Sequence, residues 1–309
     1  MSCMTAADRA AEPAAPVSGS TAGTDASAAG APRARLGAVG LVLGSAFSLQ
    51  FGSAVAALLF PRAGALGVVA LRLIFSAVLL LALFRPRLRG YTRADWLAVA
   101  GLGVALGTMN SLFYQAIDRI PLGAAVTLEL LGPLALSVIA SRRLISLAWA
   151  ALAAVGVHLL AAGDFGRLNV GGVAFALAAG AMWVAYILFN ARTGARFPKV
   201  DGLALAMGIG ALVSAPLGVI SAGTALLDPV TLGLGAAVAV LSSGLPYTLE
   251  MLALRRLPAA TFAVLMSLMP VAATTAGFLV LGQHLGPAQL LAIALVVAAS
   301  MGAVRTSRG

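Results

Sequence analysis

The chain has 309 residues, of which 61% are apolar and 10% are charged, and its mean hydropathy is +1.02. Soluble domains average about 25% charged and about 45–50% apolar residues, so this chain has too few polar residues to cover a water-soluble fold. Because the apolar residues lie in long runs, the composition excludes an ordinary globular enzyme, a disordered chain and a disulfide-rich secreted domain. The sequence predicts an all-α, polytopic membrane protein, and its one cysteine, Cys3, allows no intramolecular disulfide.

The first 35 residues differ in composition from the rest. Residues 1–35 are rich in Ala, Gly, Ser, Thr and Pro and contain no run of four apolar residues. Such a segment buries too little apolar surface to offset the entropy of ordering it, and it lacks the basic start and apolar stretch of a signal peptide. We expect residues 1–35 to form a disordered cytoplasmic tail.

From Leu36 onward, long apolar runs alternate with short polar breaks. A helix needs about 20 residues to cross the hydrocarbon core of a bilayer, which is about 30 Å thick. On this criterion the sequence predicts ten transmembrane helices. They cover residues 36–59, 65–84, 95–117, 121–140, 144–163, 170–190, 202–222, 230–253, 258–281 and 286–304.

The basic residues orient these helices. With the N-terminus in the cytoplasm, sixteen of the twenty fall on the cytoplasmic side, and three, Arg62, Arg119 and Arg167, fall on the outer side. Cytoplasmic loops carry an excess of Lys and Arg, so the sorting favours ten helices in the inner membrane with both termini in the cytoplasm. Topology and anionic lipid headgroups therefore account for the net charge of +10, and we expect no nucleic-acid partner.

An internal repeat divides the chain into two halves. The segment Ala116–Pro121 (AIDRIP) matches Ala253–Pro258 (ALRRLP) at an offset of 137 residues. We therefore expect two five-helix repeats, residues 36–163 and residues 170–304. The second repeat is inverted relative to the first because five is odd, and inverted repeats are typical of secondary transporters.

Two prolines match at the same offset. Pro133 and Pro270 fall in the middle of the helices predicted at 121–140 and 258–281. Proline removes a backbone hydrogen bond and kinks a helix, and paired interruptions in equivalent helices point to the binding site or hinge of a transporter. We interpret both prolines as hinges. The alternative is that they have no functional role, because membrane helices tolerate proline.

Three polar residues share one depth in the membrane, which predicts that they line one shared cavity. Counted from the outer ends of their helices, Arg72, Asn110 and Glu129 lie about 10–12 Å below the surface, at a rise of about 1.5 Å per residue. An ionisable residue inside a membrane is by default a candidate functional residue. Arg72 and Glu129 either bind the carboxylate and ammonium of a zwitterion or form a structural ion pair between two helices.

Other candidates lie at different depths. Glu250 is close to the cytoplasmic mouth, where it either takes part in transport or pairs with the nearby arginines. Gln50 and Tyr186 fall near mid-depth and are expected to line the cavity. The rings of Trp183 and Tyr247 either stack on the substrate or pack against neighbouring helices.

Several chemistries are absent from the sequence. The single lysine, Lys199, stands in no Walker A motif, so this chain does not itself use ATP. His158 and His284 lie far apart in the sequence with no cysteine nearby, which excludes a His/Cys metal site. We expect no cofactor, no metal and no enzymatic activity.

Several short runs stand out in both halves of the chain. They are Met109–Tyr114 (MNSLFY), Pro121–Gly123 (PLG), Glu129–Pro133 (ELLGP), Ser141–Arg143 (SRR), Leu245–Met251 (LPYTLEM), Thr261–Phe262 (TF), Leu265–Ser267 (LMS) and Ala298–Gly302 (AASMG). These runs resemble the threonine/homoserine exporter group of the EamA-type drug/metabolite transporter superfamily, and the likeness covers about residues 36–304. Tyr114, at the end of the first run, joins the candidate substrate residues.

The resemblance implies a ten-helix inner-membrane exporter of small amino acids that uses the proton gradient. Two positions depart from the family pattern, because this chain has Met269 and Gln283 where the family often has glutamate. If either acid serves proton coupling, that role has passed here to Glu129. Two alternatives stay open: efflux of another metabolite or drug by the same fold, and a channel or membrane scaffold.

Overall fold

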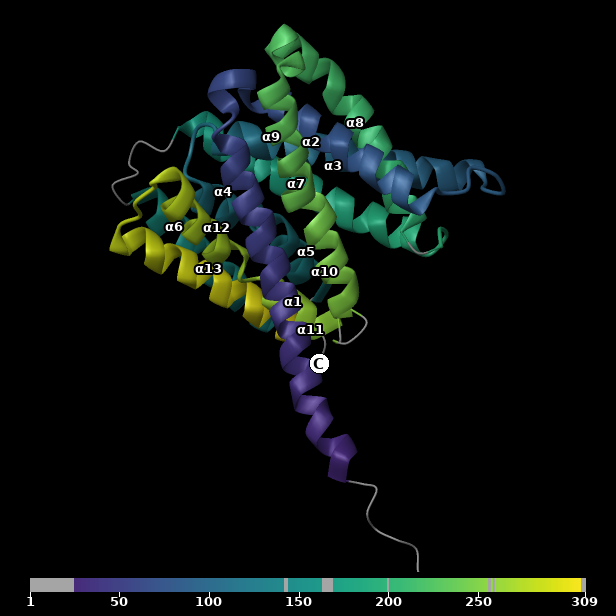
Figure 1. Ribbon diagram of the computed structural model, residues 1–309. Coiled ribbons are helices and arrows are strands. Elements are labelled where there is room, and N and C mark those ends of the chain that lie inside the picture. The colour runs from purple at the N-terminus through teal and green to yellow at the C-terminus, as the bar shows by residue number, and fades with distance from the viewer. Residues whose placement is uncertain are drawn as a thin grey trace, which may run out of the picture.

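Figure 1 shows the computed structural model of the protein, which describes residues 25–306 apart from 142–143, 163–168, 199, 255–256 and 258. Every regular element in these residues is a helix. The elements are α1 (Asp25–Ala57), α2 (Phe60–Phe84), α3 (Arg93–Ile117), α4 (Leu122–Glu129), α5 (Leu131–Ser141), α6 (Leu144–Ala162), α7 (Val170–Gly194), α8 (Asp201–Ala222), η1 (Gly223–Leu227), α9 (Pro229–Ala239), η2 (Val240–Gly244), α10 (Leu245–Leu254), α11 (Ala259–Met266), α12 (Met269–Leu281) and α13 (Pro287–Thr306).

Each predicted span corresponds to one helix or one interrupted helix. Within the described residues, nine segments are long and apolar enough to cross a membrane, and Ile145–Leu159 forms a shorter apolar helix. The prediction of a polytopic, all-helical membrane protein is therefore confirmed. The predicted tail differs in part, because α1 begins at Asp25 and its alanine-rich first turns are helical. Residues 1–24 lie outside the described part of the chain.

Two spans are interrupted at matching places. Helix α4 ends at Glu129 and α11 ends at Met266, and at the offset of 137 residues the bounds of α4 coincide with those of α11. In each copy the matched proline stands four residues after the last residue of the short helix. Because proline has no N–H to donate back to that residue's carbonyl, the sequence interrupts both helices at equivalent points.

A third span contains a π-helical turn, η2, between α9 and α10. The backbone N–H of Leu245 donates to the carbonyl of Val240, five residues earlier, instead of to Leu241. Such π-turns are rare and are frequent at functional sites. The interrupted helix α9–η2–α10 lies beside α1, and Figure 1 shows the two running alongside each other through the molecule.

Helices α3 and α9 begin with similar caps. At α3, the Thr92 side chain accepts a hydrogen bond from the backbone N–H of Asp95, and the Asp95 carboxylate accepts one from the backbone N–H of Thr92. At α9, the Asp228 carboxylate accepts hydrogen bonds from the backbone N–H and the hydroxyl of Thr231. Both caps satisfy N–H groups that have no partner inside the helix.

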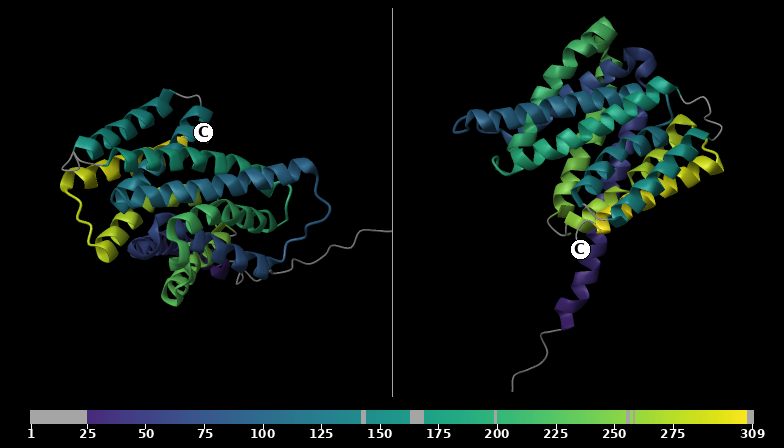
Figure 2. Two further views of the ribbon diagram at one scale, coloured as in Figure 1. Left: turned by 90° about the horizontal axis from the view of Figure 1, so that it is seen from above. Right: turned by 180° about the vertical axis from the view of Figure 1, so that it is seen from behind.

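The helices pack mainly in pairs. Helix α2 packs along α8, α3 along α7, and α6 along α13. The view from above in Figure 2 shows α3 and α7 running side by side. Helix α1 contacts both α10 and α12, and Figure 1 shows its first turns extending beyond the other helices. This arrangement places two of the interrupted helices, α9–η2–α10 and α11–α12, against α1, while α4 packs on α12 and α7.

Two glycines bring the first interrupted helix against α7. A Cβ atom on Gly132 would overlap the carbonyl oxygen of Gly180, and one on Gly180 would lie 2.6 Å from the carbonyl oxygen of Glu129. The backbones are therefore in direct contact at this point, as at the small-residue interfaces of other membrane helices. The contact fixes the backbone at the break between α4 and α5, and with it the position of Glu129.

Candidate substrate cavity at the interrupted helices

A cavity of about 530 Å³ lies where the interrupted helices meet. It is lined by residues from α1, α2 and α3, from α7 and α13, and from all three interrupted helices. Most predicted site residues line it. These are Gln50, Arg72, Asn110, Glu129, Pro133, Tyr186 and Glu250. The structure thus brings together side chains that are up to 200 positions apart in the sequence (Gln50 to Glu250).

The three remaining predicted site residues are placed differently from those that line the cavity. Tyr114 is fully buried and contacts Arg72 rather than the cavity. Pro270 is not among the lining residues, although its neighbour Met269 is. The side chain of Tyr247 lies outside the part of the structure that is described. The predictions for Tyr114 and Pro270 therefore concern positions behind the cavity wall.

Arg72 is the buried cation of the cavity. Its side chain, 5% exposed, donates one hydrogen bond from Nη1 to the hydroxyl of Tyr114 at 3.1 Å. A second runs from Nη2 to the backbone carbonyl of Ser242 at 3.2 Å. The guanidinium also lies 5.5 Å from the centre of the Tyr114 ring. These contacts orient the guanidinium but leave Nε without a hydrogen-bond partner.

The π-turn makes backbone carbonyls available to α1 and α2. In an α-helix the carbonyl of Ser242 would accept from residue 246, but Pro246 has no N–H. Arg72 on α2 donates to this carbonyl instead. The carbonyl of Leu241 has lost its donor to the π-turn and accepts from the hydroxyl of Ser48 on α1 at 2.7 Å. The interrupted helix is thus joined to the first half of the chain at the Arg72 site.

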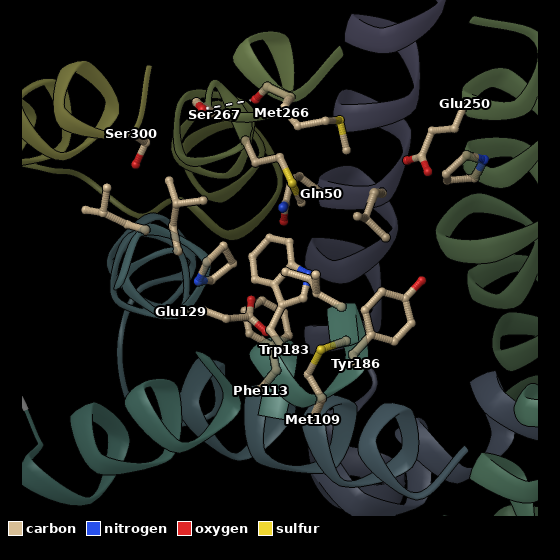
Figure 3. Close-up of a pocket in the computed structure, with 18 of the residues that line it drawn as sticks. Gln50, Met109, Phe113, Glu129, Trp183, Tyr186, Glu250, Met266, Ser267 and Ser300 are labelled. Atoms are coloured by element: carbon tan, nitrogen blue, oxygen red, sulfur yellow. Dashed lines mark hydrogen bonds between the residues drawn. The ribbon is translucent and has the colours of Figure 1, made fainter. Parts of the chain in front are cut away.

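Glu129 lies at the C-terminal end of α4, directly before the break. Its side chain, 8% exposed, lines the cavity, and Figure 3 shows the carboxylate beside Phe113 and Trp183. Arg72 lines the same cavity. The two form no ion pair within 4.0 Å in the described structure, which disagrees with the structural ion pair that the sequence left open. Both charges therefore remain available to a third group.

Glu250 lies on the opposite side of the cavity from Glu129, with Trp183 and Tyr186 between them in Figure 3. Its Oε1 accepts a hydrogen bond from the hydroxyl of Ser45 on α1 at 2.6 Å. The alternative predicted from the sequence was that Glu250 pairs with the nearby arginines, and residues 255 and 256 lie outside the part of the chain that the structure describes. Glu250 therefore joins α10 to α1 at the end of the cavity away from the α4–α5 break.

The amide side chains differ in their partners. Asn110 donates from Nδ2 to the carbonyl of Leu106, one turn earlier in α3. Gln50 is 2% exposed, and its Oε1 has no hydrogen-bond partner. Sequence reasoning missed Ser242 and Ser300, which also line the cavity. Pro246, four residues after Ser242, was a signal in the sequence that a free carbonyl lies there.

The fold and the cavity define a class of protein. Interrupted membrane helices around a buried polar site are the arrangement of secondary transporters, and intramembrane charges mark the pathways of their substrates. Comparison with known proteins agrees with this class. The EamA-like transporter family matches residues 170–305.

Curated relatives are similar over most of the chain. The threonine/homoserine exporter RhtA of Escherichia coli strain K12 is 44% identical over 84% of this chain and 89% of its own length. The same values hold for RhtA of Salmonella typhimurium strain SL1344. The chain belongs to the threonine/homoserine exporter group of the EamA transporter superfamily. A crystal structure of a protein 19% identical in sequence shares the fold, with a TM-score of 0.53 over 91% of this chain and 99% of that one.

Proposed function

We propose that this protein exports small amino acids, threonine and homoserine first among them, across the cytoplasmic membrane by proton-coupled alternating access. The observation that carries the proposal is a cavity in which two buried ionisable side chains of opposite type, Arg72 and Glu129, face a common space without pairing. The names of the relatives, which are threonine/homoserine exporters, support the choice of substrate.

The two charges suit the two ends of a zwitterion. The free donors of Arg72 would bind the α-carboxylate, and Glu129 would bind the α-ammonium. A cavity of about 530 Å³ falls within the range of roughly 300–1,000 Å³ that is common for small-molecule sites. Trp183 and Tyr186 would cover the apolar part of the substrate between the ionic groups and Glu250.

Proton coupling is assigned to Glu129. Met269 lines the cavity without a titratable group. Gln283 accepts a hydrogen bond from the backbone N–H of Leu122 at the start of α4, so it caps a helix instead of facing the cavity. The carboxylates left in the cavity wall are Glu129 and Glu250. Of these, Glu129 lies nearer the proposed substrate charges and would exchange its proton for the ammonium.

Alternating access would use the two five-helix repeats, residues 36–163 and 170–304, with Pro133 and Pro270 as hinges. The coinciding bounds of α4 and α11 support this division. The basic residues support an inner-membrane protein with both termini in the cytoplasm. We infer no enzymatic role and no cofactor, and we expect protons, the amino acid and the bilayer as partners.

The proposal is tested by the Glu129→Gln variant. Purified protein is reconstituted in liposomes preloaded with threonine, and entry of labelled threonine is measured with and without a pH gradient. Because glutamine can neither release a proton nor pair with the substrate ammonium, the variant is expected to exchange threonine more slowly than the wild type and to lose the response to the gradient. The control is Asp201→Asn, a carboxylate outside the cavity lining, which should respond as the wild type does.

Other outcomes of this assay have distinct meanings. A normal pH response in Glu129→Gln would remove coupling from this residue. Counterflow with other metabolites or drugs, but not with threonine or homoserine, would keep the transporter and discard the substrate. Absence of exchange of any compound by folded protein would contradict transport and leave a channel or scaffold.

A second prediction concerns Pro246. Alanine at this position restores an N–H that competes for the carbonyl of Ser242, so Arg72 loses one of the two groups that orient it. We expect the KM for threonine to rise about five- to tenfold, the effect of one hydrogen bond, with little change in maximal rate. The control is Pro216→Ala inside α8, which does not line the cavity. An unchanged KM in Pro246→Ala would show that this carbonyl does not position Arg72.

A further inference from the structure

Ser300, on α13, has a hydroxyl group that the binding of a zwitterion by Arg72 and Glu129 does not use. Its side chain is 4% exposed and belongs to the wall of the cavity. The Oγ atom is buried and has no hydrogen-bond partner in the described structure. An unpartnered buried hydroxyl destabilises the folded state, so each such group in a folded protein calls for an explanation.

Ser300 shares the lack of a partner with four other buried hydroxyls of the described residues, those of Ser76, Thr193, Ser242 and Ser243, of which Ser242 also lines the cavity but sits at the Arg72 site. A serine or threonine inside a helix commonly donates to the carbonyl one turn earlier. Several hydroxyls of the described helices do so, including Ser267, which lines the same cavity and donates to Ala263 at 3.1 Å. The others are Ser53, Ser111, Thr127, Thr248, Thr274, Thr275 and Thr306. Ser300 makes no such bond, so its hydroxyl is free to bind a group in the cavity.

The surroundings of Ser300 set it apart from the ionic groups. Its nearest lining neighbours in the sequence, Ala303 and Val304 on the same helix, are apolar. Leu134 on α5, which also lines the cavity, is apolar too. Figure 3 shows Ser300 and Ser267 on one side of the cavity and Glu250 on the opposite side. Ser300 therefore presents one hydroxyl in a mainly apolar part of the wall.

We propose that Ser300 binds the side-chain hydroxyl of the substrate and makes the cavity selective for hydroxylated amino acids. This inference rests on the proposed function, since it assumes that an amino acid binds between Arg72 and Glu129. Threonine and homoserine are both 2-aminobutyrate with one added hydroxyl, on the β- or the γ-carbon. A serine hydroxyl rotates about one bond and both donates and accepts, so it can pair with either.

The parent compound 2-aminobutyrate, which lacks the added hydroxyl, is the probe for this inference. A site that forms a hydrogen bond to a substrate hydroxyl discriminates against the analogue that lacks it, because the buried group of the site is then left unpaired. In liposomes containing the full chain, unlabelled threonine and unlabelled 2-aminobutyrate compete with labelled threonine for counterflow. The wild type is expected to prefer threonine by about tenfold or more.

Two substitutions of Ser300 and one control test the assignment. In Ser300→Ala and Ser300→Cys the preference is expected to fall to about twofold or less, while 2-aminobutyrate competes as well as it does in the wild type. The alanine variant removes an unpartnered hydroxyl, so its thermal midpoint is expected to equal or exceed that of the wild type. Ser267→Ala, which removes a hydroxyl already bonded within its own helix, should keep the preference.

The outcomes separate this inference from the proposed function. Threonine exchange with an unchanged preference in both Ser300 variants overturns the role of Ser300 and leaves amino-acid export intact. An equal loss of preference in Ser267→Ala overturns the assignment to Ser300 alone. A wild type that exchanges threonine and 2-aminobutyrate equally shows that the cavity does not recognise the hydroxyl. A folded wild type that exchanges neither compound overturns both proposals.

Discussion

Replacement of Arg72 with glutamine is expected to reduce threonine counterflow about thirtyfold or more, because removal of one partner of a buried, hydrogen-bonded charge pair, here the pair with the substrate carboxylate, costs about 2–5 kcal/mol. The guanidinium supplies the positive charge that the substrate carboxylate requires. It also holds the hydroxyl of Tyr114 and the carbonyl of Ser242. Arg72→Lys is expected to fail as well, since an ammonium lacks the planar fork that reaches both partners.

Counterflow and thermal unfolding are measured on the same preparations, so that loss of transport is distinguished from loss of the fold. Tyr114→Phe removes one orienting hydrogen bond and keeps the charge, so it should raise the KM about as much as Pro246→Ala does and lose much less transport than Arg72→Gln. Arg119→Gln is the control for charge, because Arg119 lies over Phe175 and outside the cavity lining. Threonine exchange at the wild-type rate in Arg72→Gln would remove Arg72 from the substrate site.

The Gly132→Ala variant is expected to lose stability by about 3 kcal/mol or to fail to fold. The added methyl group would overlap the carbonyl oxygen of Gly180, and backbone atoms cannot rotate away as a flexible side chain can. The expected relaxation is a separation of α5 from α7, which would also move the backbone next to Glu129. Thermal unfolding in detergent, followed by size-exclusion chromatography, measures the loss.

The matched control for Gly132 is Gly233→Ala in α9. A Cβ atom at Gly233 would have no atom within 4 Å, so this variant should unfold at the wild-type temperature or slightly above it. Equal stability of Gly132→Ala and Gly233→Ala would show that the contact between α5 and α7 is looser than the structure describes.

The positions of the helices could be predicted because apolar runs of about 20 residues have few other interpretations. The grouping of Arg72, Asn110 and Glu129 in one cavity followed from their common depth, and the structure confirms it. The start of α1 was wrong in the sequence interpretation because a segment rich in alanine has helix propensity even without an apolar face.

The partners of the site residues could not be predicted from the sequence. Ser242 contacts Arg72 through its backbone carbonyl, and because every residue has such a carbonyl, the residue type carries no signal for this contact. The free hydroxyl of Ser300 depends on a rotamer, and its sequence context resembles that of serines that bond to their own helix. Such details depend on packing between distant segments.

The π-turn also bears on the history of the chain. The caps at Thr92 and Asp228 lie 136 residues apart, whereas the matching segments that begin at Ala116 and Ala253 lie 137 apart. Under the two-repeat proposal, the second copy is therefore one residue longer than the first between the cap and the end of the helix. A helix can absorb an extra residue as a π-turn and keep the orientation of its later turns. Here the extra residue is accommodated in Val240–Gly244, where the π-turn leaves free the carbonyls to which Ser48 and Arg72 donate.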